Sequence, residues 1–337
     1  MTAAPTPTQR ETVLRAATSA PSKYNTQPWW FRWDGGDLEV HVDPTRRLPR
    51  SDPAGREAVI ACGAATFAAR LGYAACGFGT AVEGRPDEDD PLFAARVRVV
   101  AEAPDPRFVE LHPYLARRRT DRGPFQDTPV PTAVLDELGA AARAEDAWLR
   151  VAAWEPAYDH LLALIREATW LEEQGLRDER AAWVDAPDAA RRREGVGAES
   201  LGPLPEQPTG TVRDLAVGRD IAGREHTAFE ARPTIAVLET ASDTRGDWLA
   251  AGQALLRVLV TATRRGVAAS FANQPLEDEE LRFEAGHLTL PPGEALHRSA
   301  QMILRLGLST TQAPSTPRRA PADVLEPPTW HTSRSRS

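Results

Sequence analysis

CGAATFAARLGYAACGF (residues 62–78) and AGQALLRVLVTATRRGV (residues 251–267) decide the fold of this chain. Both stretches are rich in small and apolar residues, whose spacing is typical of a helix that buries one face. Two glycines fourteen residues apart stand at the same places in both, as Gly63 and Gly77 and as Gly252 and Gly266. The match indicates an internal repeat.

The segments that flank these stretches extend the repeat. LEVHV (38–42) and ARVRVV (95–100) lie before and after the first stretch, and PTIAVLE (233–239) and MILRLG (302–307) lie before and after the second. All four are typical of β-strands. One matching helix could arise by chance, but three elements in the same order favour two copies of one α/β unit. We therefore predict an α+β fold with an internal duplication.

Composition restricts the class of protein. The chain has 337 residues, 42% apolar and 26% charged, which excludes a wholly disordered or collagen-like chain. No apolar run approaches the roughly 18–20 residues of a membrane span, and the first residues lack the pattern of a secretion signal. The net charge of −8 disfavours binding to nucleic acid. We expect a cytoplasmic protein with no membrane and no nucleic-acid partner.

The segment at about 185–232 differs from the rest of the chain. It is charged, punctuated by glycine and proline, and weakly periodic. A loop of that length is uncommon in a compact domain unless it is a lid or is disordered. We expect a lid-like insertion that forms no core of its own and lies over the surface.

Motifs for catalysis by protein side chains are absent from the sequence. The seven histidines show no metal-ligand spacing, and there is no nucleophile elbow, Walker A loop or GxGxxG fingerprint. We therefore expect no metal site and no catalytic side-chain dyad.

One candidate binding segment is PSKYNTQPW (21–29). Its prolines fix a turn that can present backbone N–H groups and short polar side chains to a phosphate or to the edge of a heterocycle. The same pattern fits a simple turn in which Ser22 and Asn25 bond their own backbone.

A second candidate is ARRRTDRGPF (116–125), in which Arg118, Thr120 and Arg122 alternate. In an extended segment the three side chains point to one side and form a cradle of two guanidinium groups and a hydroxyl, suited to phosphate. An exposed basic loop is the other interpretation. PRR (317–319) could add a third cationic contact.

RRTDRGPFQDTPVPTAVLDELGAAAR (118–143) resembles the opening of the FMN-dependent nitroreductase superfamily. APSKYNTQPWWF (20–31) is similar to a second landmark of that superfamily, but it stands about a hundred residues before the basic segment instead of after it. This arrangement resembles the Acg-type subfamily, and the resemblance covers most of residues 11–325. Further similar segments are DPAGREAVIACGAATFAARL (52–71), GDWLAAGQALLRVLVTATRRGVAAS (246–270), QPLE (274–277), QMILRLG (301–307) and PRRAPADVL (317–325).

The resemblance implies a nitroreductase-like fold. Typical members of the superfamily are homodimers with FMN at the interface, whereas this sequence looks like two degenerate copies fused in one chain as an intramolecular pseudo-dimer. The first half, residues 1–116, keeps the PSKYNTQPW loop, and the second half, residues 117–337, keeps the basic phosphate strand. In the second half EDAWLR (145–150) stands where that loop belongs, so the two halves together provide the parts of one FMN site.

The resemblance also implies three groups of site residues. One group holds the phosphate, one approaches the flavin from the other half, and one contributes backbone near the reactive edge of the ring. The phosphate group comprises Arg118, Thr120 and Arg122 with Arg318 or Arg319. The group that approaches the flavin from the other half comprises Ser22, Asn25 and Gln27. The backbone near the reactive edge belongs to Ala272 and Asn273. Tyr24 departs from the family, which often has histidine there.

The function implied is that of an FMN-dependent oxidoreductase. Hydride equivalents from NAD(P)H would pass through flavin N5 to a small organic acceptor such as a quinone, a nitroaromatic compound or an enone. Two alternatives stay open: an FMN-sequestering protein whose lid shuts the flavin away, and a flavin dehydrogenase or oxidase of a biosynthetic intermediate. The fusion of two halves predicts a monomer or a loose homodimer.

Overall fold

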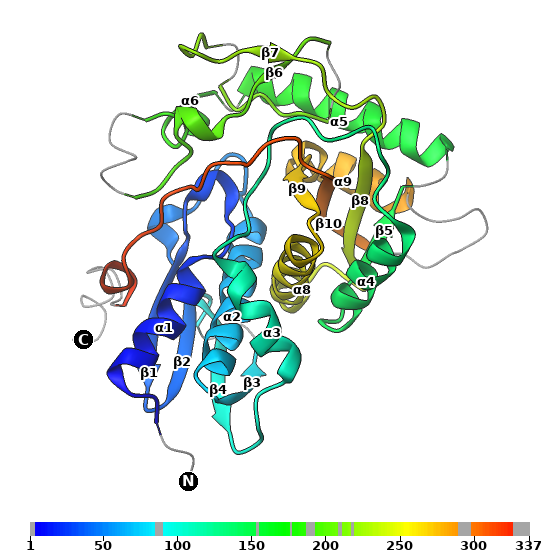
Figure 1. Ribbon diagram of the computed structural model, residues 1–337. Helices are drawn as coiled ribbons and strands as arrows, with labels where there is room; N and C mark the ends of the chain where they lie inside the picture. Colours follow the sequence, from blue (N-terminus) through cyan, green and yellow to red (C-terminus); the bar gives the residue numbers. More distant parts are fainter. Residues whose placement is uncertain are drawn as a thin grey trace.

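The computed structural model describes residues 4–84, 90–152, 155–175, 177–186, 193–207, 211–216, 219–288 and 298–325. Two four-stranded antiparallel sheets lie side by side, and two long helices, α2 and α8, pack against each other between them (Figure 1). The mixed helix and sheet content agrees with the α+β prediction.

The first sheet comes from the first third of the chain. β1 (Trp29–Asp34) and β2 (Asp37–Val42) form a hairpin closed by Gly35 at a φ of 58°. Helix α2 (Arg56–Ala75) covers one face of this sheet, and α1 (Pro7–Thr18) packs against α2. The remaining elements are β3 (Gly79–Glu83), β4 (Phe93–Val100) and α3 (Pro106–Leu115).

The second sheet has the same arrangement. Its strands are ordered β5-β8-β10-β9, as the first sheet is ordered β1-β2-β4-β3. In both sheets the strand that follows the long helix lies at the edge, and the last strand lies next to it. The elements are α4 (Thr132–Arg143), β5 (Trp148–Val151), α5 (Glu155–Gly175), β8 (Thr234–Thr240), α8 (Arg245–Arg264), β9 (Ala268–Phe271), α9 (Glu279–Leu288) and β10 (Ser299–Gly307).

The glycines of the sequence repeat lie where α2 and α8 cross. A Cβ atom on Gly63 would lie 2.2 Å from the carbonyl oxygen of Leu249, and one on Gly252 would lie 2.0 Å from that of Ile60. Only glycine permits this approach of the two backbones. Gly77 and Gly266, with φ of 85° and 72°, lie just after the ends of the two helices.

Helix α2 is long and apolar enough to cross a membrane by length and composition alone, with a mean hydropathy of 1.4 over the most apolar part. In the structure 89% of that part is buried inside the protein. This is the environment of a core helix, and it follows from the packing of α2 between the first sheet and α8.

Helix α1 begins at Pro7 because Thr6 and Gln9 form a capping box. The sequence did not predict α3, α9, β3 or β9.

The insertion at about 185–232 runs across the top of both sheets in Figure 1, with short strands β6 (Leu204–Pro205) and β7 (His226–Thr227). It packs through a small apolar cluster that it shares with residues outside the insertion. Its described apolar side chains are too widely spaced to give a periodic signal, yet they fold onto the first half and bury a small cluster. The cluster comprises Val196, Leu201, Leu215 and Ala216 together with Val184, Tyr24 and Leu48.

The C-terminal segment 308–325 returns from the second sheet to the first half, as the red trace in Figure 1 shows. Its short helix Pro321–Val324 contacts α1 and β1, and Val324 is buried in the core of the first half. The side-chain Nδ2 of Asn25 donates to the carbonyl oxygen of Pro317 at 3.0 Å. The sequence assigned this segment to the second half. Ser309 and Thr310 do bond to Asp121 and Pro124 of that half, whereas the part from Pro317 on contacts the first half.

Candidate functional site

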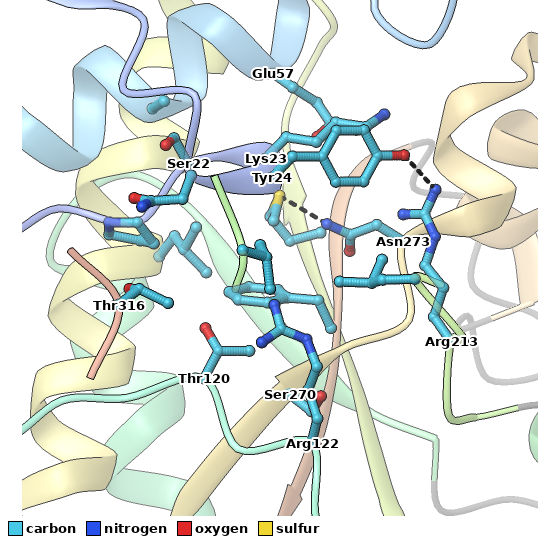
Figure 2. A pocket seen from close by; sticks show the side chains of 18 of the residues that line it. Ser22, Lys23, Tyr24, Glu57, Thr120, Arg122, Arg213, Ser270, Asn273 and Thr316 are labelled. Atoms are coloured by element: carbon cyan, nitrogen blue, oxygen red, sulfur yellow. Dashed lines mark hydrogen bonds and ion pairs between the residues drawn. The ribbon is translucent and has the colours of Figure 1, made fainter. Parts of the chain in front are cut away.

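A cleft of about 1030 Å³ opens where the two halves meet (Figure 2). Its walls come from the loop before β1, the start of α2, the middle of α8, the insertion and the segment after α3. Residues at β9 and β10 and the C-terminal segment complete the lining. Because these segments lie far apart in the sequence, only the tertiary fold brings them together.

The PSKYNTQPW loop forms one wall in a strained conformation. Tyr24, Asn25 and Gln27 have φ angles of 48°, 55° and 51°, which residues other than glycine rarely adopt. The backbone N–H of Gln27 donates to Oγ of Ser22 at 2.9 Å, and Asn25 donates to the carbonyl oxygen of Gly195 at 2.9 Å. Ser22 and Asn25 therefore stabilise the turn and also line the cleft.

Arg118, Thr120 and Arg122 line the same cleft, and Arg318 reaches it from the C-terminal segment. The segment that carries the first three runs beside β9, where the N–H of Asp121 donates to the carbonyl oxygen of Ala269 at 2.9 Å. This contact holds the alternating segment extended. Figure 2 shows Thr120, Arg122 and Thr316 on one side of the cleft and Lys23, Tyr24 and Glu57 on the other.

Burial lowers the pKa of all three arginines, and two of them, Arg118 and Arg318, have incomplete hydrogen bonding. Burial and the neighbouring Arg119 lower the pKa of Arg118 to about 10, and burial and Arg118 lower the pKa of Arg318 to about 9. Burial and Arg213 lower the pKa of Arg122 to about 10. Nε and Nη1 of Arg118 and Nε of Arg318 are buried without a hydrogen-bond partner.

Among the described residues, no carboxylate forms an ion pair with Arg118, Arg122 or Arg318. A concentration of buried cationic donors without acidic partners disfavours an empty site and fits a dianionic phosphate group. We call these three residues the arginine cluster.

At the other end of the cleft the charges are balanced. Nζ of Lys23 lies 2.9 Å from Oε1 of Glu277 and 3.5 Å from Oε1 of Glu57. Arg213, from the insertion, lies 2.8 Å from the same oxygen of Glu277 and donates to the hydroxyl of Tyr24 at 2.9 Å (Figure 2). Burial alone would lower the pKa of Lys23, but Glu277 and Glu57 outweigh burial and raise it above its usual value.

Between these two ends the walls are largely apolar. Such walls suit a flat ring system, which they can hold and shield from water. The apolar lining residues are Ile60, Ala61, Val196, Val212, Leu215, Leu255, Phe271 and Met302.

Three of the residues implied by the family resemblance do not line the cleft. The side chain of Gln27 accepts from the N–H of Arg319 at 2.8 Å and donates to the carbonyl oxygen of Arg193 at 2.8 Å. Arg319 points toward Asp323, and Ala272 is fully buried with its N–H bonded to Ile303. Asn273 does line the cleft, and its Oδ1 accepts from the N–H of Ile303 at 2.8 Å.

Sequence reasoning missed the charged end of the cleft. Lys23, Glu57, Arg213 and Glu277 are far apart in the chain and have no motif in common. One signal was available: Lys23 is the single lysine of a chain with thirty-nine arginines. In the parts of the chain that the structure describes, no group of three or more His, Cys, Asp or Glu side chains is placed to hold a metal ion.

No family model matches the chain. It is 31% identical to “Putative NAD(P)H nitroreductase Rv3131” of Mycobacterium tuberculosis over 94% of its own length and 91% of that protein. It is 29% identical to “Putative NAD(P)H nitroreductase acg” of the same organism, over 94% of each chain.

Two solved structures are also similar. The FMN-dependent nitroreductase NfnB of Mycobacterium smegmatis in complex with NADPH is 16% identical, with a TM-score of 0.37 over 68% of this chain and 98% of that chain. A nitroreductase with bound FMN from Bacteroides fragilis is 14% identical, with a TM-score of 0.36 over 61% of this chain and 92% of that chain.

Proposed function

The chain belongs to the Acg-type family of NAD(P)H nitroreductases, and from this premise we propose that it is an FMN-dependent oxidoreductase that passes hydride equivalents from NAD(P)H to a small organic acceptor. The observation that carries the proposal is the arginine cluster at one end of a cleft with apolar walls. The unpartnered N–H groups of Arg118 and Arg318 supply the donors that a flavin phosphate requires.

In this proposal the protein binds and orients, and FMN supplies the chemistry, because a flavin can take up and release hydride at N5. The arginine cluster and the hydroxyls of Thr120 and Thr316 hold the phosphate. The apolar walls hold the ring and exclude water from it. Lys23 and Arg213 are held at the other end by Glu277, so their charges are fixed without a ligand.

We further infer that the two halves are degenerate copies arranged as an intramolecular pseudo-dimer. The matching strand orders and the Gly63–Gly252 crossing support this inference. The second copy lacks a counterpart of the PSKYNTQPW loop, because only residues 144–147 join α4 to β5. Within that turn Glu145 lies 2.6 Å from Arg70 and 2.7 Å from Arg257, so these two arginines share a carboxylate partner, which the arginine cluster lacks.

Because only one copy of the repeat keeps the PSKYNTQPW loop, we predict one FMN per chain. Release of the flavin by heat, followed by quantitation against protein concentration, should give a molar ratio near one. A ratio near two would contradict the degenerate second copy. Recovery of FAD in place of FMN would contradict the phosphate assignment.

The function is tested by anaerobic mixing of the purified yellow protein with NADH or with NADPH while the flavin absorbance is followed. We expect rapid bleaching by at least one donor. A protein that keeps its flavin and is bleached by neither donor would instead be a sequestering protein. This alternative is favoured by the insertion, because four of its residues line the cleft: Val196, Val212, Arg213 and Leu215.

Replacement of Arg213 by methionine tests whether the insertion covers the flavin. The substitution removes the ion pair with Glu277 but leaves the arginine cluster intact, so FMN should stay bound. Iodide quenching of flavin fluorescence and the rate of reduction by NAD(P)H should both rise several-fold. Arg232→Met is the matched control, because Arg232 belongs to the same insertion but lies on the surface.

If Arg213→Met releases the flavin, the insertion is part of the binding site. If quenching and reduction stay unchanged, the insertion does not limit access to the ring.

A further inference from the structure

A second cavity, of about 570 Å³, adjoins the cleft at the arginine cluster. The two spaces share Arg118, Thr120, Thr316 and Arg318. Of these two spaces, Arg119 lines the second and not the cleft, and we call the second space the Arg119 cavity. Its other lining residues are Ser19, Leu115, Ala116, Ser200, Pro314 and Ser315.

The lining of the Arg119 cavity has the chemistry of an anion site. Among the described residues that line it, three are arginines, five carry hydroxyl groups and none carries a carboxylate. Oγ of Ser200 is buried without a hydrogen-bond partner, in a residue that is 5% exposed. Buried polar groups are nearly always satisfied, so the unpartnered Ser200 hydroxyl indicates a ligand atom on this side.

The charges exceed what a flavin phosphate can neutralise. A phosphate monoester carries roughly two negative charges, and the arginine cluster alone provides three positive ones. Arg119 adds a fourth, and its Nη1 donates only to the backbone oxygens of Ala116 and Arg118. Burial lowers the pKa of Arg318 and of Arg118, and the charges of the neighbouring guanidinium groups lower both further. A second anionic group beside the first would relieve it.

We propose that the Arg119 cavity binds the diphosphate of the NAD(P)H donor, next to the phosphate of FMN. The inference rests on the proposed function. In the donor a ribose joins the nicotinamide ring to the diphosphate, and in FMN a ribityl chain of similar length joins the flavin ring to its phosphate. If the stacked nicotinamide ring has its ribose on the ribityl side of the flavin, the donor diphosphate lies beside the flavin phosphate, where Arg119 and Ser200 lie.

A flavin that itself carries a second phosphate and an adenosine has the same chemistry and could occupy the same space. The NAD(P)H donor and such an extended flavin differ in how they exchange. The donor exchanges with solution, whereas an extended flavin purifies with the protein.

The test is calorimetric titration of the FMN-loaded protein with adenosine 5′-diphosphoribose, which has the diphosphate but no nicotinamide to react. Arg119→Ala should weaken this binding about ten- to a hundred-fold, as expected for one charge-assisted contact. Ser200→Ala should weaken it a few-fold. Arg117→Ala is the control, because Arg117 is the neighbouring arginine and does not line the cavity.

The flavin content of all three variants should equal that of the wild type. In steady-state assays Arg119→Ala should raise the KM for the donor and leave kcat unchanged, because the diphosphate is held equally before and during hydride transfer.

The inference is overturned if Arg119→Ala binds adenosine 5′-diphosphoribose as the wild type does, or if the wild type does not bind it, while the flavin is still bleached by NAD(P)H. It is also overturned if Arg119→Ala releases the flavin and that flavin is FAD. Failure of the proposed function has a different signature, which is a wild-type protein that contains no flavin or is bleached by neither donor.

Discussion

Replacement of Gly63 by valine is expected to prevent the chain from folding. The new Cβ would lie 2.2 Å from the carbonyl oxygen of Leu249 and 3.0 Å from Cα of Gly252, and both are backbone atoms. Relief of the collision requires α2 and α8 to separate, which opens the core between the halves. Overpacking in an ordinary core costs about 1–3 kcal/mol, and a collision with backbone should exceed that range. We expect no soluble protein, or a much lower urea midpoint by circular dichroism.

Gly77→Ala is the matched control for this prediction. Gly77 belongs to the same repeat and has a φ of 85°, but a Cβ there would meet no atom within 4 Å. Only the backbone strain of a left-handed residue remains, roughly 1–2 kcal/mol. If Gly63→Val were no less stable than Gly77→Ala, the close crossing of the two helices would be wrong.

Replacement of both Arg118 and Arg318 by alanine should abolish FMN binding. Each charge-assisted contact to phosphate contributes roughly 1.5–3 kcal/mol, which corresponds to about ten- to a hundred-fold in affinity for each substitution. Stability of the flavin-free protein should change little, because relief of the burial of Arg318 and of the repulsion from Arg118 offsets the loss of its hydrogen bonds to Asn25 and Thr316. Fluorescence titration with FMN and thermal unfolding of the flavin-free protein measure the two effects separately.

Arg122→Ala should weaken FMN binding about ten- to a hundred-fold. Arg117→Ala should leave the affinity for FMN within a few-fold of the wild-type value. Arg117 has the same charge and is a close neighbour of Arg118 in sequence, but it does not line the cleft. Equal loss of flavin from Arg117→Ala would show that general positive charge, and not the cluster, holds the phosphate.

The parts of the fold that could be predicted are those that depend on local pattern. The apolar spacing of α2 and α8 is visible in a short window, and so is the hairpin turn around Gly35. The start of α1 is also local, because Thr6 and Gln9 of its capping box are three residues apart. Strands β3 (GTAVE) and β9 (AASF) consist mostly of small residues, which give little apolar alternation.

The residues of the candidate site also divide into those that a local pattern predicts and those that it does not. Arg118, Thr120 and Arg122 could be proposed together because one extended segment carries them and gives them one direction. Lys23, Arg213 and Glu277 come from three distant segments, and nothing local indicates that they meet. The resemblance pointed to Gln27 and Ala272 as site residues, but the tight turn of the loop and the pairing with Ile303 direct them away from the cleft.

The return of the C-terminal segment to the first half has a consequence for biosynthesis. Domains fold progressively, from the N-terminal end, as the chain leaves the ribosome. The loop with Ser22 and Asn25 emerges early, whereas Thr316 and Arg318 emerge only after nearly all of the chain that the structure describes has been made. The proposed flavin site is therefore incomplete until Arg318 has left the ribosome. Truncated chains that end before Thr316 should bind FMN much more weakly than the full chain.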